Sequence, residues 1–179
     1  MVYMMTHPGK KLMFMGCELG MFREWDFADQ LEWFLLKYDM HASMQLFVAE
    51  LNRLYLASSP LWERDDRWEG FSWIDADNAD QSIFSYRRID EKGRELVVLI
   101  NFTPVQRDDF LLAVPKKGRY EEVFNSDHSR FGGSGVTNGG ILSTEPCEGL
   151  RGGAHAIRIS VPPMSGLIFR PTKNVNKKI

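Results

Sequence analysis

The chain has 179 residues, 44% of them hydrophobic, and its 22 Lys and Arg against 24 Asp and Glu give a formal net charge of -2. This balance argues against a nucleic-acid-binding protein, because a face that neutralises many phosphates needs an excess of basic side chains. The longest apolar runs, residues 96–100 and 111–114, are far shorter than the roughly 20 residues of a membrane-spanning helix. The sequence therefore predicts a soluble protein that binds neither nucleic acid nor membranes.

Two further features predict the cytoplasm as the location. The first residues contain no extended apolar signal-peptide segment, since residues 6–11 read Thr-His-Pro-Gly-Lys-Lys. The sequence has 2 cysteines, Cys17 and Cys147. Two cysteines are too few for a disulfide framework and suit a reducing compartment.

The first third of the chain has the pattern of a strand, a loop and a helix. Residues 11–16 form a short apolar run that ends at a glycine, which is typical of a buried strand. Over residues 40–57, apolar side chains recur at spacings of three and four, which predicts an amphipathic helix. Pro60 then ends the helical pattern, because proline lacks the N–H that a helix needs. This places a domain boundary near residue 60.

After Pro60 the apolar pattern alternates with a period of two, as it does in strands. Strands are predicted over residues 82–88, 96–102, 110–114, 119–124 and 155–161, with a hairpin turn at 90–93 and a glycine-rich loop at 132–140. Short strands without intervening helices indicate an antiparallel β-sandwich or barrel of about seven or eight strands. We therefore expect a mostly β fold, with an all-β domain over residues 61–172 and a disordered tail over 173–179.

The common catalytic and metal-binding patterns fail on their context. The glycines of residues 132–135 are not followed by the Lys-Ser/Thr pair of a phosphate-binding loop. The four histidines have no metal-ligand spacing, so no metal site is expected. Adjacent acids, as at Asp108 and Asp109, would point to opposite faces of a strand and do not resemble a general acid and base. No catalytic residue is predicted.

The segment over residues 16–33 mixes aromatic side chains with carboxylates and arginine. Sugar rings have apolar faces that stack on aromatic rings, and hydroxyls that hydrogen-bond charged groups. A carbohydrate site is one interpretation of this mixture, and its candidate residues are Glu18, Arg23, Glu24, Trp25 and Asp26. The other interpretation is structural, with the aromatic residues acting as anchors of the loop.

An ordered series of sequence blocks begins with the run from His7 to Gly20, followed by Arg23-Glu24-Trp25. Further blocks occupy residues 31–36, 51–55, 70–74, 100–105 and 131–134. Together these blocks resemble bacterial 1,4-alpha-glucan (glycogen) branching enzymes of the alpha-amylase superfamily. The resemblance extends to about Pro171, and so covers nearly the whole chain.

This resemblance implies a C-terminal piece of such an enzyme. Residues 1–60 would be the last strand, loop and helix of a (β/α)8 barrel, and residues 61–172 the all-β domain that follows it. The family transfers an α-1,4-glucan segment to a 6-hydroxyl in glycogen synthesis, with retention of configuration, through carboxylates on earlier barrel strands. No catalytic acid and no cofactor is therefore expected in this chain. The implied partner is an α-glucan such as glycogen or amylose.

On the same resemblance, Glu18, Arg23, Glu24 and Trp25 match the family motif and are the predicted substrate-binding residues. Four neighbours depart from the family pattern, namely Cys17, Leu19, Met21 and Phe34. Two of them, Met21 and Phe34, put an apolar side chain where the family usually has a polar one. The alternative is structural, with Trp25 and Trp33 sealing the barrel mouth against the β-domain.

Two other functions stay open. The chain could be a non-catalytic glucan-binding β-domain with Trp62, Trp68 or Trp73 as stacking platforms, or it could belong to another alpha-amylase-family hydrolase, trehalose-releasing or debranching. One strand and one helix cannot close a barrel. Residues 1–33 are therefore expected either to pack irregularly on the β-domain or to associate with a second copy of the chain.

Overall fold

The computed structural model describes residues 1–23 and 26–172. Glu24, Trp25 and the predicted tail over residues 173–179 lie outside the described residues. The helical elements are α1 (Val2–Thr6), α2 (Asp39–Ala57) and five short 3-10 helices, η1 (Cys17–Leu19), η2 (Trp33–Lys37), η3 (Ser59–Leu61), η4 (Trp68–Gly70) and η5 (Ser129–Phe131). The strands are β1 (Phe71–Asn78), β2 (Ile83–Ile89), β3 (Glu95–Asn101), β4 (Arg107–Val114), β5 (Arg119–Asn125), β6 (Ile141–Ser143), β7 (Glu145–Pro146), β8 (His155–Val161) and β9 (Gly166–Thr172).

The strands form two antiparallel sheets, which confirms the prediction of a mostly β fold. The larger sheet has six strands in the order β1-β2-β3-β9-β5-β6, and the smaller has three in the order β4-β8-β7. The chain passes from β6 to β7 across the single residue Thr144, which joins the sheets at that edge. At the opposite edge β1 and β4 are each the outermost strand of their sheet.

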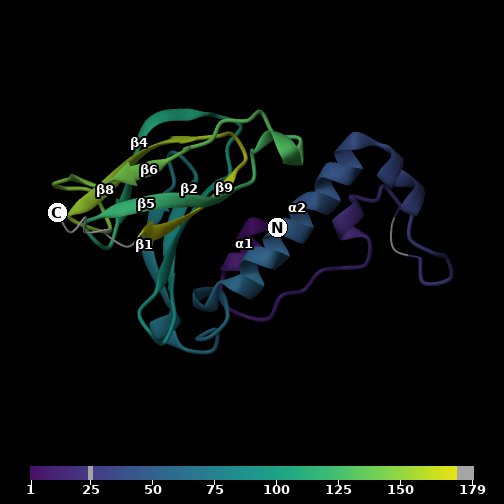
Figure 1. Cartoon of the computed structure of the whole chain (residues 1–179), viewed down its shortest axis with the longest axis horizontal. Coiled ribbons are helices and arrows are strands. Elements are labelled where there is room, and N and C mark those ends of the chain that lie inside the picture. Colours follow the sequence, from purple (N-terminus) through teal and green to yellow (C-terminus); the bar gives the residue numbers. More distant parts are fainter. Residues whose placement is uncertain (24–25, 173–179) are drawn as a thin grey trace, which may run out of the picture.

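Two hydrophobic cores lie on the two faces of the six-stranded sheet. One core fills the space between the sheets and includes Val97, Leu99, Leu112 and Ile157. The other core packs α1, α2 and η3 against the far face of the larger sheet, through Val2, Met5, Leu51, Leu61, Val98, Ile100 and Ile168. The molecule thus has three layers, with the six-stranded sheet in the middle (Figure 1). All seven residues of β3 are buried because both faces of that strand are covered.

The prediction of a strand over residues 11–16 is wrong. These residues belong to no strand, and Leu12 is 80% exposed. A strand forms only where a neighbouring strand accepts its N–H and C=O bonds. Among the described residues both sheets are assembled without this segment. Helix α2 agrees with the predicted helix to within one residue, so one element of the expected barrel unit is present and the other is not formed.

Arg88 on β2 is fully buried and connects three parts of the chain. Its guanidinium donates hydrogen bonds to the carbonyl oxygen of Thr6 at 2.7 Å, to the carbonyl oxygen of Gly70 at 3.1 Å and to the carboxylate of Asp65 at 2.7 Å. A buried charge is tolerated only when it is paired and hydrogen-bonded in this way. Arg88 therefore holds α1 and residues 65–70 on the helix-covered face of the larger sheet.

Candidate functional site

The structure describes two of the four predicted substrate-binding residues. Glu18 lies on η1, which is anchored by the fully buried side chain of Leu19 and by a 2.7 Å hydrogen bond from His41 Nδ1 to the Leu19 carbonyl. Arg23 is exposed and pairs with Asp26 and Asp29, each at 3.3 Å. Among the described residues no hydrogen bond or ion pair joins Glu18 to Arg23, and their role in binding sugar remains a prediction.

The three tryptophans considered as stacking platforms all reach the surface. Trp68 is 91% exposed, while Trp62 and Trp73 are each 44% exposed. The Trp73 ring packs edge-on against Phe71 at 5.0 Å and against Tyr86 at 5.6 Å, between ring centres. Trp73 is therefore partly committed to packing within the helix-covered side of β1.

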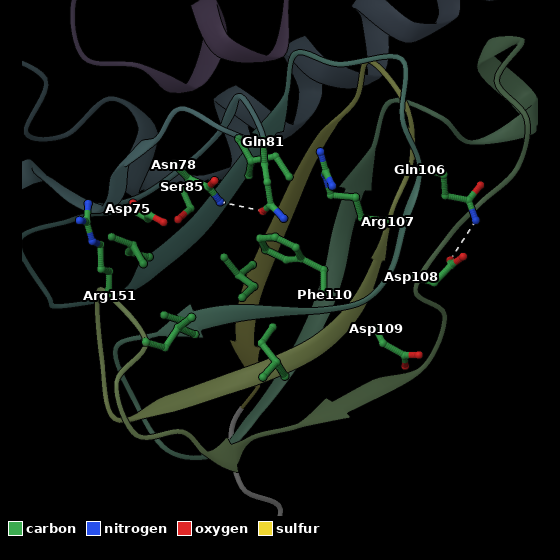
Figure 2. Close-up of a pocket in the computed structure, with 16 residues that line it drawn as sticks. Asp75, Asn78, Gln81, Ser85, Gln106, Arg107, Asp108, Asp109, Phe110 and Arg151 are labelled. Carbon is green, nitrogen blue, oxygen red and sulfur yellow. Dashed lines mark hydrogen bonds between the residues drawn. The ribbon is translucent and has the colours of Figure 1, made fainter.

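A cleft of about 550 Å³ opens between β1 and β2 of the larger sheet and β4 of the smaller one. We call it the β1–β4 cleft. It lies at the open edge of the sandwich because three strands cannot cover the whole width of six. Its floor consists of core side chains, and its rim is polar (Figure 2). The floor includes Ile74, Ile83 and Leu112, and the rim includes Asp75, Asn78, Gln81, Arg107, Asp108 and Arg151.

A β-bulge at the start of β4 brings Arg107 and Phe110 to the same face of the sheet. In a regular strand two residues three apart point to opposite faces. Arg107 pairs with Val161, and Phe110 pairs with Ile159, so three steps along β4 correspond to two along β8. The extra residue is accommodated by Asp109, whose φ of 54° is uncommon for a residue other than glycine. Such bulges re-aim side chains and are frequent beside functional sites.

Phe110 and Arg107 therefore both line the β1–β4 cleft. Figure 2 shows the Phe110 ring directed into the cleft, toward the side of Gln81, whereas Asp109 points outward. The Nε atom of Arg107 is buried and has no hydrogen-bond partner among the described residues. An unpaired buried donor costs about 1–3 kcal/mol. A residue that lines the cleft thus has a buried polar group whose hydrogen-bonding capacity is unused.

Other polar groups at the rim are held in place by hydrogen bonds between side chains. Asn78 donates to Gln81 at 2.9 Å, and Gln106 donates to Asp108 at 2.9 Å. Holding an amide or a carboxylate in one orientation reduces the entropy lost when a ligand binds to it.

The loop over residues 149–153 closes one end of the β1–β4 cleft. Gly152 has a φ of 95°, and a Cβ atom there would come within 2.5 Å of Ile74 Cγ2. Only glycine allows the loop to approach β1 so closely. The preceding residue, Arg151, forms an ion pair with Asp77 at 3.1 Å. The loop therefore contributes the Arg151 side chain to the rim.

Sequence reasoning did not find the β1–β4 cleft. Asp108 and Asp109 were set aside because strand neighbours point to opposite faces, and that reasoning assumed a regular strand. The one available signal was the polar stretch Gln106 to Asp109 directly before Phe110, since acidic residues are uncommon inside strands.

Within residues 1–23 and 26–172, no group of three or more His, Cys, Asp or Glu side chains is placed to hold a metal ion. No helix in those same ranges is long and apolar enough to cross a membrane.

The two-sheet architecture defines the class of protein. The family described as the alpha amylase C-terminal all-beta domain matches residues 73–172, and the chain belongs to this family. Solved structures share the fold at low sequence identity. A debranching enzyme of Nostoc punctiforme is 13% identical with a TM-score of 0.50, and it covers 94% of this chain and 29% of its own. The catalytic module of the pneumococcal virulence factor SpuA is 12% identical with a TM-score of 0.51, covering 81% of this chain and 20% of its own.

Curated relatives give a more particular similarity. The chain is 43% identical to a 1,4-alpha-glucan branching enzyme of Pseudomonas fluorescens, over 94% of this chain and 23% of that protein. It is 45% identical to the branching enzyme of Oceanobacillus iheyensis, over 94% of this chain and 26% of that protein. The enzyme of Halothermothrix orenii is 43% identical, over 94% and 27% respectively. The chain thus spans about a quarter of the length of these relatives, and its resemblance to branching enzymes is confirmed.

Proposed function

We propose that this chain is the C-terminal part of a bacterial 1,4-alpha-glucan branching enzyme. The observation that carries the proposal is the extent of the similarity. The family domain begins at residue 73, whereas the branching enzymes match 94% of the chain. The similarity therefore includes most of the first 60 residues, which we assign to the last strand, loop and helix of the (β/α)8 barrel. Residues 61–172 form the all-β domain of the same enzyme.

The surface of residues 1–60 supports this assignment. Many large apolar side chains are exposed there, and exposed apolar surface can mark a region that packs against other protein. They include Leu12, Phe14, Phe22, Phe27, Trp33, Phe34, Tyr38 and Met40, each more than half exposed. In the whole enzyme, residues 12–15 would gain neighbouring strands and complete the barrel. With no such neighbours, the same surface would favour self-association.

The proposed reaction moves an α-1,4-glucan segment to a 6-hydroxyl during glycogen synthesis in the cytoplasm. A retaining transfer needs two carboxyl groups about 5–5.5 Å apart, one as nucleophile and one as acid and base. We place these carboxylates on barrel strands outside this chain. This chain would contribute Glu18, Arg23, Glu24 and Trp25 beside the barrel mouth. Identity of 43–45% to proteins named as branching enzymes favours transfer over hydrolysis.

A chimera tests the proposal. The C-terminal segment of the Pseudomonas fluorescens relative is replaced by this chain, and branching is followed by the fall in iodine-stain absorbance of amylose. The chimera should branch amylose, while this chain alone and the relative lacking its C-terminal segment should not. A soluble, monodisperse chimera without activity would contradict the assignment, as would branching by this chain alone.

A further inference from the structure

The β1–β4 cleft has the dimensions of a ligand site and is separate from the residues assigned to the barrel mouth. Its volume of about 550 Å³ lies within the range of about 300–1,000 Å³ that is typical of small-molecule sites. It is lined by β1, β2 and β4, and none of residues 1–60 takes part in it.

The charges around the cleft favour an uncharged ligand. Asp109 points outward, so two carboxylates, those of Asp75 and Asp108, stand against the two guanidinium groups of Arg107 and Arg151. The charges are balanced: an anion such as phosphate would meet the two carboxylates, and a cation would meet the two arginines. Amides, carboxylates and guanidinium groups together offer both donors and acceptors, which matches a ligand rich in hydroxyls.

The apolar part of the cleft suits the ring face of a sugar. The bulge in β4 turns Phe110 into the cleft beside Arg107, as derived above from the register with β8. An aromatic ring stacks on the C–H face of a pyranose, while a neighbouring arginine donates to its hydroxyls. The Arg107 side chain makes no hydrogen bond to the described residues, so the guanidinium N–H groups that it brings to the cleft wall are available as donors to sugar hydroxyls.

We propose that the β1–β4 cleft is a non-catalytic binding site for a neutral carbohydrate chain, with Phe110 as the stacking platform and Arg107 as the principal hydrogen-bond donor. Asn78 and Gln81 bind further hydroxyls from the opposite wall, where a mutual hydrogen bond holds them in place. The loop bearing Arg151 closes one end, so the chain of sugars enters from the side of Gln106 and Asp108.

The first test uses the full chain with no substitution. Backbone amide signals are recorded by NMR during a titration with maltoheptaose. Saturable shifts are expected in residues 74–85 and 107–112, and a parallel titration with inorganic phosphate should leave these signals unchanged. The proposal is overturned if maltoheptaose causes no saturable shift, if shifts are confined to residues 16–37, or if phosphate alone shifts the cleft signals.

Variants then identify the contacts. Phe110→Ala and Arg107→Met should each weaken maltoheptaose binding about tenfold or more in calorimetry, because each removes one well-placed contact. Arg119→Met removes an exposed arginine outside the cleft, and Trp68→Ala removes the most exposed of the tryptophans that the structure describes. Both should bind like the unmodified chain. Loss of binding in Trp68→Ala with retention in Phe110→Ala would refute the site. Failure of the chimera would leave this result unaffected, because the titration uses this chain alone.

Discussion

Replacing Arg88 by methionine should cost about 3 kcal/mol of folding stability. Methionine keeps the apolar stem but removes all three hydrogen bonds that the buried guanidinium makes to Thr6, Gly70 and Asp65. Breaking a buried ion pair from one side typically costs about 3–5 kcal/mol. The lower end is expected here, because Asp65 is 19% exposed and has Lys11 at 4.0 Å as a second partner.

Urea unfolding followed by tryptophan fluorescence measures this loss. With a denaturant slope of about 2 kcal/mol per molar, the midpoint should fall by about 1.5 M. The matched control is Arg53→Met on α2, whose side chain is 69% exposed and pairs with Glu50. A surface pair of this kind contributes less than about 1 kcal/mol. The interpretation of Arg88 as a clamp is refuted if both variants shift the midpoint equally, or if trypsin cleaves at Lys10 and Lys11 no faster in Arg88→Met.

Three further predictions concern titration and backbone conformation. Burial raises the pKa of Asp90, but hydrogen bonds from Ser59 and Arg94 outweigh this effect, so the pKa is lowered. The stability that results is present above about pH 4 and is lost as the pH falls through the lowered pKa. In melting experiments, Asp90→Asn should lose less stability on acidification than the unmodified chain. Burial raises the pKa of Tyr120 to about 12, so absorbance at about 295 nm should show this side chain ionising only well above pH 10. Folding stability should decline between about pH 10 and 12. Ionisation of Tyr120 near pH 10 in the folded chain would contradict this. In urea unfolding, Gly152→Ala should destabilise the chain by about 2 kcal/mol more than Gly149→Ala. Both glycines have positive φ, but only at Gly152 would the added Cβ atom lie within 2.6 Å of Ile74. Equal losses in the two variants would count against this close approach.

Two elements could be predicted from the sequence because their two faces differ, whereas β3, buried on both faces, was found through the hairpin turn that precedes it. Helix α2 and strand β8 each have one apolar and one polar face, and both were predicted to within one residue. Strand β9 was missed, although it lies between β3 and β5 in the larger sheet. Its residues Leu167, Ile168 and Phe169 are all fully buried, so the strand has no alternation to detect. An apolar run of this kind also misled the prediction for residues 11–16, because a run does not reveal whether a pairing strand exists.

The two candidate sites also differ in how far the sequence reveals them. Residues 18–25 attracted attention through composition, which is visible in the sequence. The β1–β4 cleft depends on the register of β4 against β8 and on the unequal width of two sheets. Neither the bulge that places Arg107 beside Phe110 nor the loop approach at Gly152 is visible without the paired strands. Pairing is a long-range property, and local patterns carry little information about it.

Strand β3, at the centre of the six-stranded sheet, has no face left for water, and this bears on how the protein could be recombined with its relatives. On one side, α1 and α2 cover Leu96, Val98, Ile100 and Ile168. On the other side, the smaller sheet covers Val97, Leu99 and Phe169. A junction at residue 60 would therefore separate side chains that pack as one body and pair them with a foreign set. Crossovers that keep Val2–Thr6, α2 and the sheet together preserve both interfaces. The unit that should be exchanged intact is therefore larger than the all-β domain alone.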